Sequence, residues 1–277
     1  MMIERKHPVK RVLLYLLLIA LTIITLLPLL WMLSSSFKLS SEVFTFPIKW
    51  IPEKFHFENY VTIWQKINLA RYTFNSFKLA FIITFIQLAT SSFAAYGFSK
   101  CKFPGRNGLF LAYIATIAIP WQVYMLPQYI MMQKFGLIDT HLAIILLQSF
   151  TAFGVFLLRQ FYMSIPNELL EAARIDGLNE YSTFSRIVLP LTKPAMATLI
   201  IMSFVTVWND FMGPMIYFNS DKNKTIQLGI QMFTGLYSTE YGLIMATSIL
   251  ALLPVLIVFL AFQRFFVEGI SSSGLKG

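Results

Sequence analysis

The sequence has few charged residues and almost no cysteine. Only 13% of its 277 residues are charged and 57% are hydrophobic, whereas a typical soluble domain is about 25% charged. A soluble protein of this length lacks the volume to bury so much apolar surface, and the same composition excludes a disordered chain. The single cysteine, Cys101, excludes a disulfide within the chain and a metal site built from several cysteines. The composition predicts an integral membrane protein.

Motifs that mark nucleotide-binding and catalytic proteins are also absent from the sequence. It contains no G-x-x-x-x-G-K-[ST] or G-x-G-x-x-G phosphate loop, no H-E-x-x-H, no C-x-x-C and no G-x-S-x-G. The three histidines, His7, His56 and His141, lie far apart. We therefore expect no enzyme activity, no catalytic residue, no metal site and no cofactor on this chain. Energy for transport would come from a partner or an ion gradient, and the scarcity of embedded acidic residues argues against a proton-coupled carrier.

Six segments are long and apolar enough to cross a membrane, which takes about 20 residues as a helix. Five are free of charge and one is interrupted only by Asp210; the segments are 12–37, 79–99, 107–133, 140–158, 194–217 and 241–263. Barrel strands would instead show about ten residues of alternating polarity. The sequence predicts an all-α integral membrane protein with six transmembrane helices. The first apolar run is too long for a signal peptide and lacks a cleavage site, so we expect it to be retained.

The basic residues suggest an orientation. An even number of spans places both termini on one side, and 13 of the 22 Lys and Arg residues then fall on that side, as is typical of the cytoplasmic face. We therefore expect cytoplasmic termini, and we attribute the net charge of +9 to that face and not to nucleic-acid binding. The predicted division is a cytoplasmic N-terminus (1–11), a first helix (12–37), an extracytoplasmic loop (38–71), a five-helix core (72–266) with a cytoplasmic loop at 159–193, and a cytoplasmic tail (267–277). The aromatic loop 38–71 is either an interfacial collar or a docking surface for an external partner.

The cytoplasmic loop has the pattern of a helix-turn-helix at the membrane surface. Glu168 and Glu171 fall in the first two turns of a predicted helix, where acidic residues suit the helix dipole. Gly177 can adopt the left-handed conformation that ends such a helix. A second short helix is predicted over 179–188, stopping at Pro190. From the residues alone, the segment could also be an amphipathic connector that packs on its own bundle.

The detailed pattern of this loop resembles the EAA loop of ABC importer permeases. The matching residues are Glu171, Ala172, Ala173, Asp176, Gly177, Phe184, Ile187, Leu189, Pro190 and Pro194. The resemblance implies a coupling helix that inserts into a cleft on a cytoplasmic ATPase subunit. It implies polar contacts from Glu171 and Asp176, close packing by Ala172 and Ala173, a turn at Gly177, and membership of Leu189 and Pro190 in the same coupling motif.

Other segments are similar to carbohydrate permeases of the maltose and multiple-sugar type (MalG-like). These are Trp208-Asn209-Asp210-Phe211, Pro120-Trp121-Gln122, Leu126-Pro127 and the end of the chain from Gln263, although Ser271-Ser272-Ser273 departs from the usual tail. The resemblance implies a multi-pass protein of a bacterial cell membrane that forms a heterodimer with a second permease. It also implies two cytoplasmic ABC ATPase subunits that bind ATP and Mg, an extracytoplasmic solute-binding protein, membrane lipid around the chain, and a carbohydrate cargo.

Embedded polar and aromatic residues are the candidates for lining the transport pathway. They are Asn75, Gln87, Gln122, Tyr124, Gln148, Trp208, Asn209 and Asp210, with Gln128 as a further embedded amide. Amides suit a neutral, hydroxyl-rich solute, but each could equally form an interhelical hydrogen bond, and Asp210 could be structural. We expect an oligosaccharide importer; the alternatives are a permease for glycerol phosphate or a polyamine and, remotely, a secondary carrier or a membrane-bound transferase. Prolines 120, 127, 214 and 254 predict kinked helices.

Overall fold

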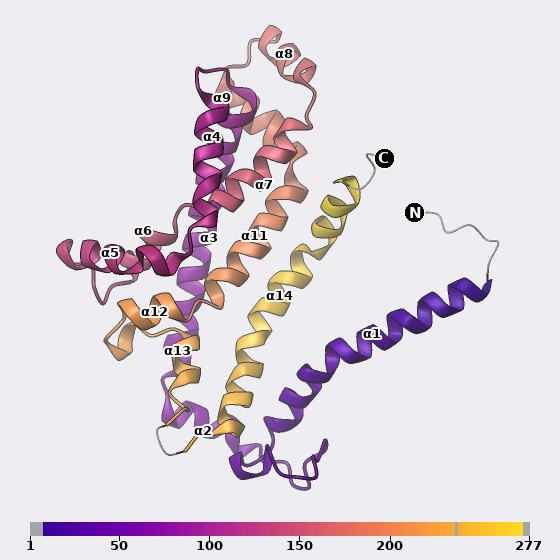
Figure 1. The fold of residues 1–277 in the computed structure, drawn as a ribbon, viewed down its shortest axis with the longest axis vertical. Coiled ribbons are helices and arrows are strands. Elements are labelled where there is room, and N and C mark those ends of the chain that lie inside the picture. The colour runs from indigo at the N-terminus through magenta and orange to yellow at the C-terminus, as the bar shows by residue number, and fades with distance from the viewer. Residues whose placement is uncertain (1–7, 236–237, 274–277) are drawn as a thin grey trace. The chain divides into compact units, whose positions relative to one another are not determined.

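The computed structural model describes residues 8–235 and 238–273. These residues form α-helices, short 3-10 and π-helical segments, and one isolated bridge between Thr234 and Thr239 (Figure 1). The chain divides into two compact units. The first comprises Met1–Leu69 and Ile230–Leu252, and the second comprises Ala70–Gly229 and Leu253–Gly277. The predicted all-α class is confirmed.

The part of the chain that the structure describes has four membrane-length helices, and six if bent pairs are counted, although the second pair includes residues that we predicted in the cytoplasmic loop. Within the described residues, four stretches are long and apolar enough to span a membrane: Val9–Ser35, Leu69–Lys100, His141–Met163 and Tyr241–Arg264. Two bent pairs also qualify: Arg106–Ala118 with Trp121–Lys134, and Glu180–Leu191 with Lys193–Trp208. The total is six if each bent pair is counted as one span.

The first unit holds the first span and the segment predicted as a loop. Its elements are α1 (Pro8–Ser35), η1 (Ser40–Glu42), α2 (Glu58–Lys66) and the beginning of α14 (Tyr241–Ser273). The membrane-length window of α1 is unburied within this chain, as suits a helix that faces lipid or another subunit. The backbone of α14 continues to Ser273, so the tail predicted at 267–277 begins as helix, and 274–277 lie outside the described residues.

A buried lysine orders the connection that follows α1. Lys38 is 1% exposed, its ammonium group lies 4.2 Å from the centre of the Trp31 ring, and it donates to the Lys49 carbonyl. Burial lowers the pKa of Lys38. Asn59 of α2 donates to the carbonyls of Ser36 and Lys38, both at 2.9 Å. The predicted loop is therefore a folded segment organised around one cation.

The second unit contains the remaining helices. They are α3 (Leu69–Lys100), α4 (Arg106–Ala115), η2 (Thr116–Ala118), α5 (Trp121–Lys134), α6 (His141–Gln148), α7 (Ala152–Met163), α8 (Asn167–Ile175), α9 (Glu180–Thr183), the π-helical segment η3 (Phe184–Val188), α10 (Leu189–Leu191), α11 (Lys193–Trp208), α12 (Met212–Tyr217), η4 (Asp221–Asn223) and α13 (Ile226–Gln231). The 32 residues of α3 extend about 48 Å at 1.5 Å per residue. That length exceeds a hydrocarbon core of about 30 Å, so α3 reaches polar surroundings at both ends.

Helices α3, α7 and α11 pack closely through a glycine. A β-carbon at Gly154 of α7 would lie 2.5 Å from the Ser91 hydroxyl of α3 and 3.1 Å from the Leu199 side chain of α11. A core cluster continues from this crossing toward α8 and α9; its members are Ala95, Tyr96, Leu158, Tyr162, Ile165, Leu170, Phe184, Val188, Ala195 and Leu199. The surface helix-turn-helix thus shares its core with the spans.

Two predicted spans are broken rather than only kinked, and both contain prolines at which we expected a kink, Pro120 and Pro214. The span at 107–133 bends by 96° between η2 and α5, at Pro120, which cannot continue the hydrogen-bond ladder. The span at 194–217 ends its first helix at Trp208 and resumes at Met212. Asp210 accounts for this second break, since its carboxylate accepts the Gly213 backbone N–H at 3.0 Å and so caps the first turn of α12.

Candidate functional site

A cavity lined by both polar and apolar side chains lies in the second unit, where several helices end or break. Its volume is about 360 Å³. It is lined by Gln87, Trp121, Tyr124, Gln128, Ile144, Leu147, Gln148, Phe150, Thr151, Thr206, Val207, Asp210, Met212, Gly213 and Tyr217. These residues come from α3, α5, α6, α11, α12 and the breaks between them, so the cavity depends on the broken helices for its shape.

The Asp210 side chain in the cavity wall is held by hydrogen bonds to both carboxylate oxygens. One carboxylate oxygen accepts the Gly213 N–H at 3.0 Å and the other accepts the Gln148 side-chain amide at 2.7 Å. A β-carbon at Gly213 would lie 2.4 Å from the carboxylate, so glycine is required for this approach. Each carboxylate oxygen retains a further acceptor position. The site can therefore accept hydrogen bonds from a ligand without moving Asp210.

The break between α6 and α7 is satisfied by side chains of α3. Gln87 donates to the Gln148 carbonyl at 2.7 Å. The Thr90 hydroxyl lies 3.1 Å from the Ser149 carbonyl, but its one proton is shared with the Ile86 carbonyl of its own helix at 2.9 Å. Thr151 then caps α7 by accepting the Gly154 N–H at 3.3 Å. A break at membrane depth needs such donors or contact with a cavity that holds water, and Gln148, Phe150 and Thr151 of this break also line the cavity.

Aromatic rings form a second part of the wall. The Trp121 indole donates to the Gln128 side-chain carbonyl at 3.0 Å, which fixes the ring orientation. Tyr124 and Tyr217 also line the cavity. The Tyr217 hydroxyl is buried, and the described residues offer it no hydrogen-bond partner, a condition that a polar ligand or water would relieve. Aromatic faces beside amides and a carboxylate can stack on a flat ring and exchange hydrogen bonds with hydroxyls.

The structure brings half of the eight predicted pathway residues together. Gln87, Tyr124, Gln148 and Asp210 line the cavity. Gln87 also forms an interhelical hydrogen bond, the alternative role that we considered for it. Its side chain lines the cavity, and its amide donates to the carbonyl at the α6–α7 break.

The other four pathway candidates lie elsewhere. Asn75 donates to the carbonyls of Lys222 and Lys224 at 2.9 and 2.8 Å, so it holds the segment before α13. Trp208 is 1% exposed and packs in an aromatic cluster of α3 and α11. Asn209 and Gln122 are exposed outside the cavity.

Sequence reasoning missed three polar residues of the cavity. Thr151, Thr206 and Tyr217 lie in or beside apolar runs, where a single hydroxyl gives no periodic signal. Thr151 carried a weak signal, because threonine is a preferred helix N-cap. This preference was the one feature of the sequence that indicated a helix start at this position, between α6 and α7.

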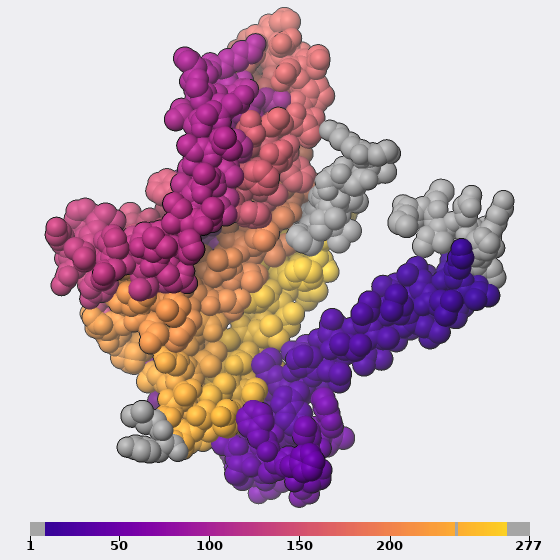
Figure 2. Space-filling model, in the orientation of Figure 1, coloured from indigo at the N-terminus to yellow at the C-terminus, as the bar shows by residue number. Residues whose placement is uncertain are grey.

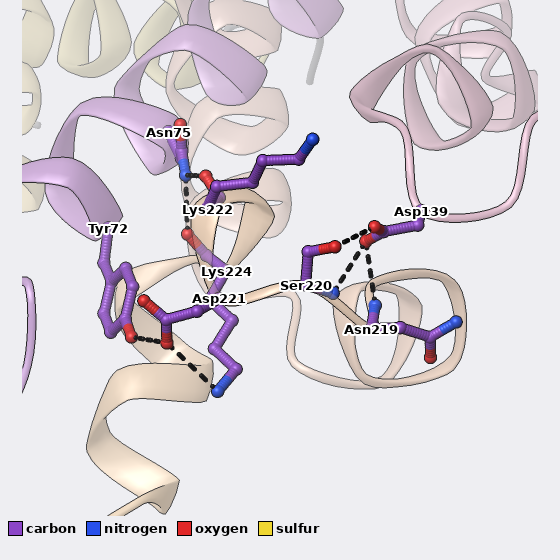
Figure 3. Close-up of polar contacts among 8 residues, drawn as sticks. All are labelled: Tyr72, Asn75, Asp139, Asn219, Ser220, Asp221, Lys222 and Lys224. Atoms are coloured by element: carbon purple, nitrogen blue, oxygen red, sulfur yellow. Dashed lines mark hydrogen bonds and ion pairs between the residues drawn. The ribbon is translucent and has the colours of Figure 1, made fainter.

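A network of polar contacts ties together the loops near the start of α3 (Figure 3). Asp139, at φ 60°, accepts the backbone N–H groups of Asn219 and Ser220, each at 2.9 Å, and also the Ser220 hydroxyl. The Ser220 hydroxyl and these N–H groups hold the pKa of Asp139 well below its usual value. The Tyr72 hydroxyl donates to Asp221 and likewise lowers the pKa of that carboxyl. We call this network the loop brace.

The loop brace and the helix-turn-helix lie near opposite ends of α3. Tyr72 of the brace and Lys100, which donates to the Ile165 carbonyl and the Asn167 side chain before α8, are about 42 Å apart along the helix axis. The second unit therefore has a polar region beyond each end of its apolar, membrane-length part.

The first helix of the surface helix-turn-helix ends as the sequence predicts. Gly177 has φ 81°, its N–H donates to the Arg174 carbonyl at 3.0 Å, and the Leu178 N–H donates to the Ala173 carbonyl at 2.9 Å. This pair of bonds is the Schellman motif, which favours glycine at the left-handed position. The predicted turn at Gly177 is present.

The two sides of α8 differ. Ala173 is 4% exposed and packs within its own chain, whereas Glu171, Ala172 and Asp176 are exposed and Ile175 is 87% exposed. In the space-filling view, the segment around α8 projects from the end of its unit (Figure 2). We expected both Ala172 and Ala173 to pack against a partner subunit. The helix directs Ala173 into the core of its own chain, so only Ala172 is exposed for such a contact.

The second half of the helix-turn-helix extends further and is less regular than predicted, because it runs from Glu180 to Leu191 and continues past Pro190, where we expected it to stop. In place of one helix over 179–188, α9 passes into a π-helical segment and then α10. Glu180 anchors it by accepting the Tyr96 hydroxyl at 2.7 Å and pairing with Arg174 at 2.8 Å. Leu189 is half-buried and Pro190 is exposed at the start of α10.

Comparison with known protein families gives a match over most of this unit. Residues 87–272 match the family described as "Binding-protein-dependent transport system inner membrane component". The matched range includes the cavity-lining residues, the helix-turn-helix and most of α14.

Relatives match over nearly the whole chain. The arabinooligosaccharides transport system permease protein AraQ of Halalkalibacterium halodurans is 33% identical over 257 residues, 92% of each chain. The sn-glycerol-3-phosphate transport system permease protein UgpE of Agrobacterium fabrum is 32% identical over 278 residues, 97% of this chain and 98% of that protein. A chain of a bacterial ABC transporter involved in the import of the acidic polysaccharide alginate has the same fold, with a TM-score of 0.81, 21% identity, and coverage of 95% of this chain and 98% of that chain.

Proposed function

This chain belongs to the family of binding-protein-dependent transport system inner membrane components, and from that premise we propose that it carries an oligosaccharide. As a family member it is a multi-pass permease of an ABC importer in the inner membrane, and it is not an enzyme. In such importers the partner ATPase subunits hydrolyse ATP. The nature of the cargo, the partner contacts and the orientation of the chain are the parts that we propose.

The chemistry of the cavity carries the cargo proposal. Trp121 and Tyr124 offer ring faces, Gln128 and Gln148 offer amides, and Asp210 offers a fixed acceptor. Sugars present flat apolar ring faces and neutral hydroxyls, which such groups bind. The AraQ relative, whose name specifies arabinooligosaccharides, supports the same class.

The UgpE relative makes glycerol phosphate the competing cargo. A phosphate ester is usually held by Arg or Lys, through charge-assisted hydrogen bonds. The described residues that line the cavity include neither, and they do include the Asp210 carboxylate, which would repel a phosphate. The cavity therefore favours a neutral saccharide.

The exposed side of α8 is the proposed contact with the ATPase. Glu171 and Asp176 provide charge, Ala172 permits close approach, and Ile175 provides an exposed apolar side chain. Exposed large apolar residues beside charges are typical of protein interfaces. Gly177 sets the end of this helix, and Ala173 secures it to its own core.

Helix α11 connects this surface to the cavity. It follows α10 across a 78° bend at Thr192 and ends at Trp208, beside Asp210. Its 16 residues span about 24 Å. In our proposal, a displacement of α8 by the ATPase reaches the cavity through α11, and the permease alternates between outward and inward access.

The proposed assembly contains further subunits. A second permease would complete the pathway as a heterodimer, two ATPase subunits would bind ATP and Mg, and a solute-binding protein would deliver cargo to the extracytoplasmic side. Both termini and α8 would lie in the cytoplasm, as the basic residues indicate. The loop brace would then lie on the outer side.

Uptake by the complete importer tests the cargo. Proteoliposomes holding the importer and its binding protein are given radiolabelled neutral oligosaccharides of several lengths and, separately, glycerol phosphate. We expect ATP-dependent uptake of a neutral oligosaccharide, and Trp121→Ala should lower it while Phe85→Ala, an exposed aromatic of α3 outside the cavity, should not. Uptake of glycerol phosphate alone would overturn the cargo proposal.

Two substitutions in α8 test the coupling contact. Ala172→Trp should insert correctly and retain the thermal stability of the permease, yet lose ATP-driven uptake, because position 172 is exposed. Ala173→Leu should lower thermal stability by overpacking its buried site. Wild-type uptake by Ala172→Trp would contradict the assignment of this face.

A further inference from the structure

A second, larger cavity lies beside the helix-turn-helix, apart from the cargo cavity. Its volume is about 540 Å³. The wall is formed by the end of α3, the connection to α4, the first turn of α4 and part of α8, which includes the exposed Glu171 that we also propose as an ATPase contact. Its lining residues are Ser99, Lys100, Lys102, Phe103, Gly105, Arg106, Asn107, Gly108, Asn167, Leu170, Glu171 and Arg174. We call it the basic cavity.

Positive charge predominates in the basic cavity. Lys100, Lys102, Arg106 and Arg174 line it, against Glu171 as the lining carboxylate. Arg174 is partly neutralised because it pairs with a glutamate of α9, at 2.8 Å. The excess of cations in one concave site would attract a ligand with a compact negative charge.

Neutral acceptors hold two of these cations in place. The Lys100 ammonium donates to the Ile165 carbonyl at 2.6 Å and to the Asn167 side-chain oxygen at 3.0 Å. The Arg106 guanidinium donates to the carbonyls of Ser99 and Cys101 at 3.4 and 3.0 Å. Carbonyl and amide oxygens fix the position of a cation without cancelling its charge. The two side chains are therefore oriented before any ligand arrives, which lowers the entropic cost of binding.

Backbone groups in the wall add to this charge. Gly105, at φ 76°, precedes α4, and no side chain caps the helix start. The first residues of this ten-residue helix line the basic cavity. N–H groups at a helix start favour an anion, so the helix supplements the lysine and arginine side chains.

The basic cavity lies at the connection between two membrane-length helices. Lys100 is the last residue of one membrane-length helix, and Arg106 is the first residue of the next. The cavity wall therefore spans the point at which the chain leaves and re-enters the membrane. Basic pockets of this kind beside transmembrane helices suit anionic headgroups.

We propose that the basic cavity binds a phosphate group, supplied by the headgroup of an anionic phospholipid. Lys102 and Arg106 contact the phosphate, Lys100 supplies charge from the end of α3, and Arg174 contributes from α8. Since α8 and the α3–α4 connection both line the cavity, a bound headgroup links the surface helix to the spans. Soluble phosphate has the same chemistry, and the experiment separates the two sources.

Lipid retention by the purified full-length chain tests this site. The permease is exchanged into nanodiscs of phosphatidylcholine with or without phosphatidylglycerol, and bound lipid is counted by native mass spectrometry after detergent release. We expect the wild type to retain phosphatidylglycerol selectively. Lys102→Gln should weaken this retention about fivefold, as expected for loss of a basic residue near an anionic surface. The double variant Lys102→Gln/Arg106→Gln should retain less phosphatidylglycerol than the single variant. The matched control is Arg186→Gln, an exposed arginine of the same surface segment that does not line the cavity.

The possible outcomes separate the interpretations. Retention of phosphatidylglycerol that falls in the Lys102 variant but not in the Arg186 variant supports the proposal. Because Arg106 also binds backbone carbonyls, the Lys102 single variant decides the case if the double variant fails to fold. A thermal shift produced by inorganic phosphate, without selective lipid retention, would replace the lipid by a soluble ligand. Equal retention of both lipids, or equal losses in the Lys102 and Arg186 variants, would overturn the site.

Discussion

Substitution of Gly177 tests how the end of α8 supports coupling. Gly177 lies in the left-handed region at φ 81°, and no atom lies within 4 Å of the position a β-carbon would take. A β-carbon at this position would therefore meet no atom outside the adjoining backbone. Its effect would come from the backbone alone, which makes the magnitude calculable.

The left-handed conformation costs an ordinary L-residue about 1–2 kcal/mol, with a β-branched residue at the unfavourable end. Asparagine tolerates this region better. Helix α8 has nine residues, and an isolated helix shorter than about 12 residues is marginal in water. Loss of 1–2 kcal/mol should therefore reduce the population of the ordered helix end by about fivefold to thirtyfold.

The assay compares Gly177→Val with Gly177→Asn in the reconstituted importer. Membrane insertion is measured first, and then uptake and cargo-stimulated ATP hydrolysis are measured in the same vesicles. We expect normal insertion of both variants, a loss of uptake per ATP of about fivefold or more for valine, and a much smaller loss for asparagine. Equal coupling in the valine variant and the wild type, or equal losses in both variants, would refute the reasoning.

Three further substitutions probe the second unit. Asp139→Asn keeps a residue that tolerates positive φ but removes the charge. Hydrogen bonds lower the pKa of Asp139, so its contribution to stability is complete at pH 7 and is lost only as the pH falls below the unfolded pKa of about 3.9. The variant should therefore unfold at a lower temperature at pH 7 and lose less stability in acid than the wild type. Gly154→Ala should destabilise by about 1–3 kcal/mol because its β-carbon would lie 2.5 Å from a serine hydroxyl, whereas Gly97→Ala, with nothing within 4 Å, should be neutral or stabilising in thermal unfolding. Gln148→Leu removes the 2.7 Å donor to Asp210 and should lower uptake without changing ATPase binding; unchanged uptake would exclude the pair from the pathway.

The spans and the turn at Gly177 could be predicted from the sequence because strong physical signals encode them. A membrane helix requires a long run without charge, and a Schellman turn favours glycine, so each feature is visible locally. The break at Asp210 was not predicted. A carboxylate in an apolar run was interpreted as part of a continuous helix, whereas its cost in hydrocarbon is relieved by capping α12 and binding Gln148.

The division of the pathway candidates could not be predicted because it depends on tertiary contacts. Asn75 and Gln87 are both amides of α3, yet one binds the loop before α13 and the other faces the cavity. Likewise, Ala172 and Ala173 are adjacent and chemically identical, and only the helix orientation decides which is buried. Sequence spacing identified the set of polar residues but could not assign the partner of each one.

The donors that α3 supplies to the α6–α7 break limit how this unit can move. Gln87 and Thr90 reach two consecutive carbonyls at 2.7 and 3.1 Å. A slide of α3 would remove the Gln87 donor from the Gln148 carbonyl, and only water or cargo in the cavity, which Gln148 also lines, could replace it. Movement of α3 against α6 and α7 therefore costs about 0.5–1.5 kcal/mol for the lost hydrogen bond, which favours movement of the three helices together. Conformational change is then expected at the bends between helices, above all at the 78° bend at Thr192, which would act as a hinge.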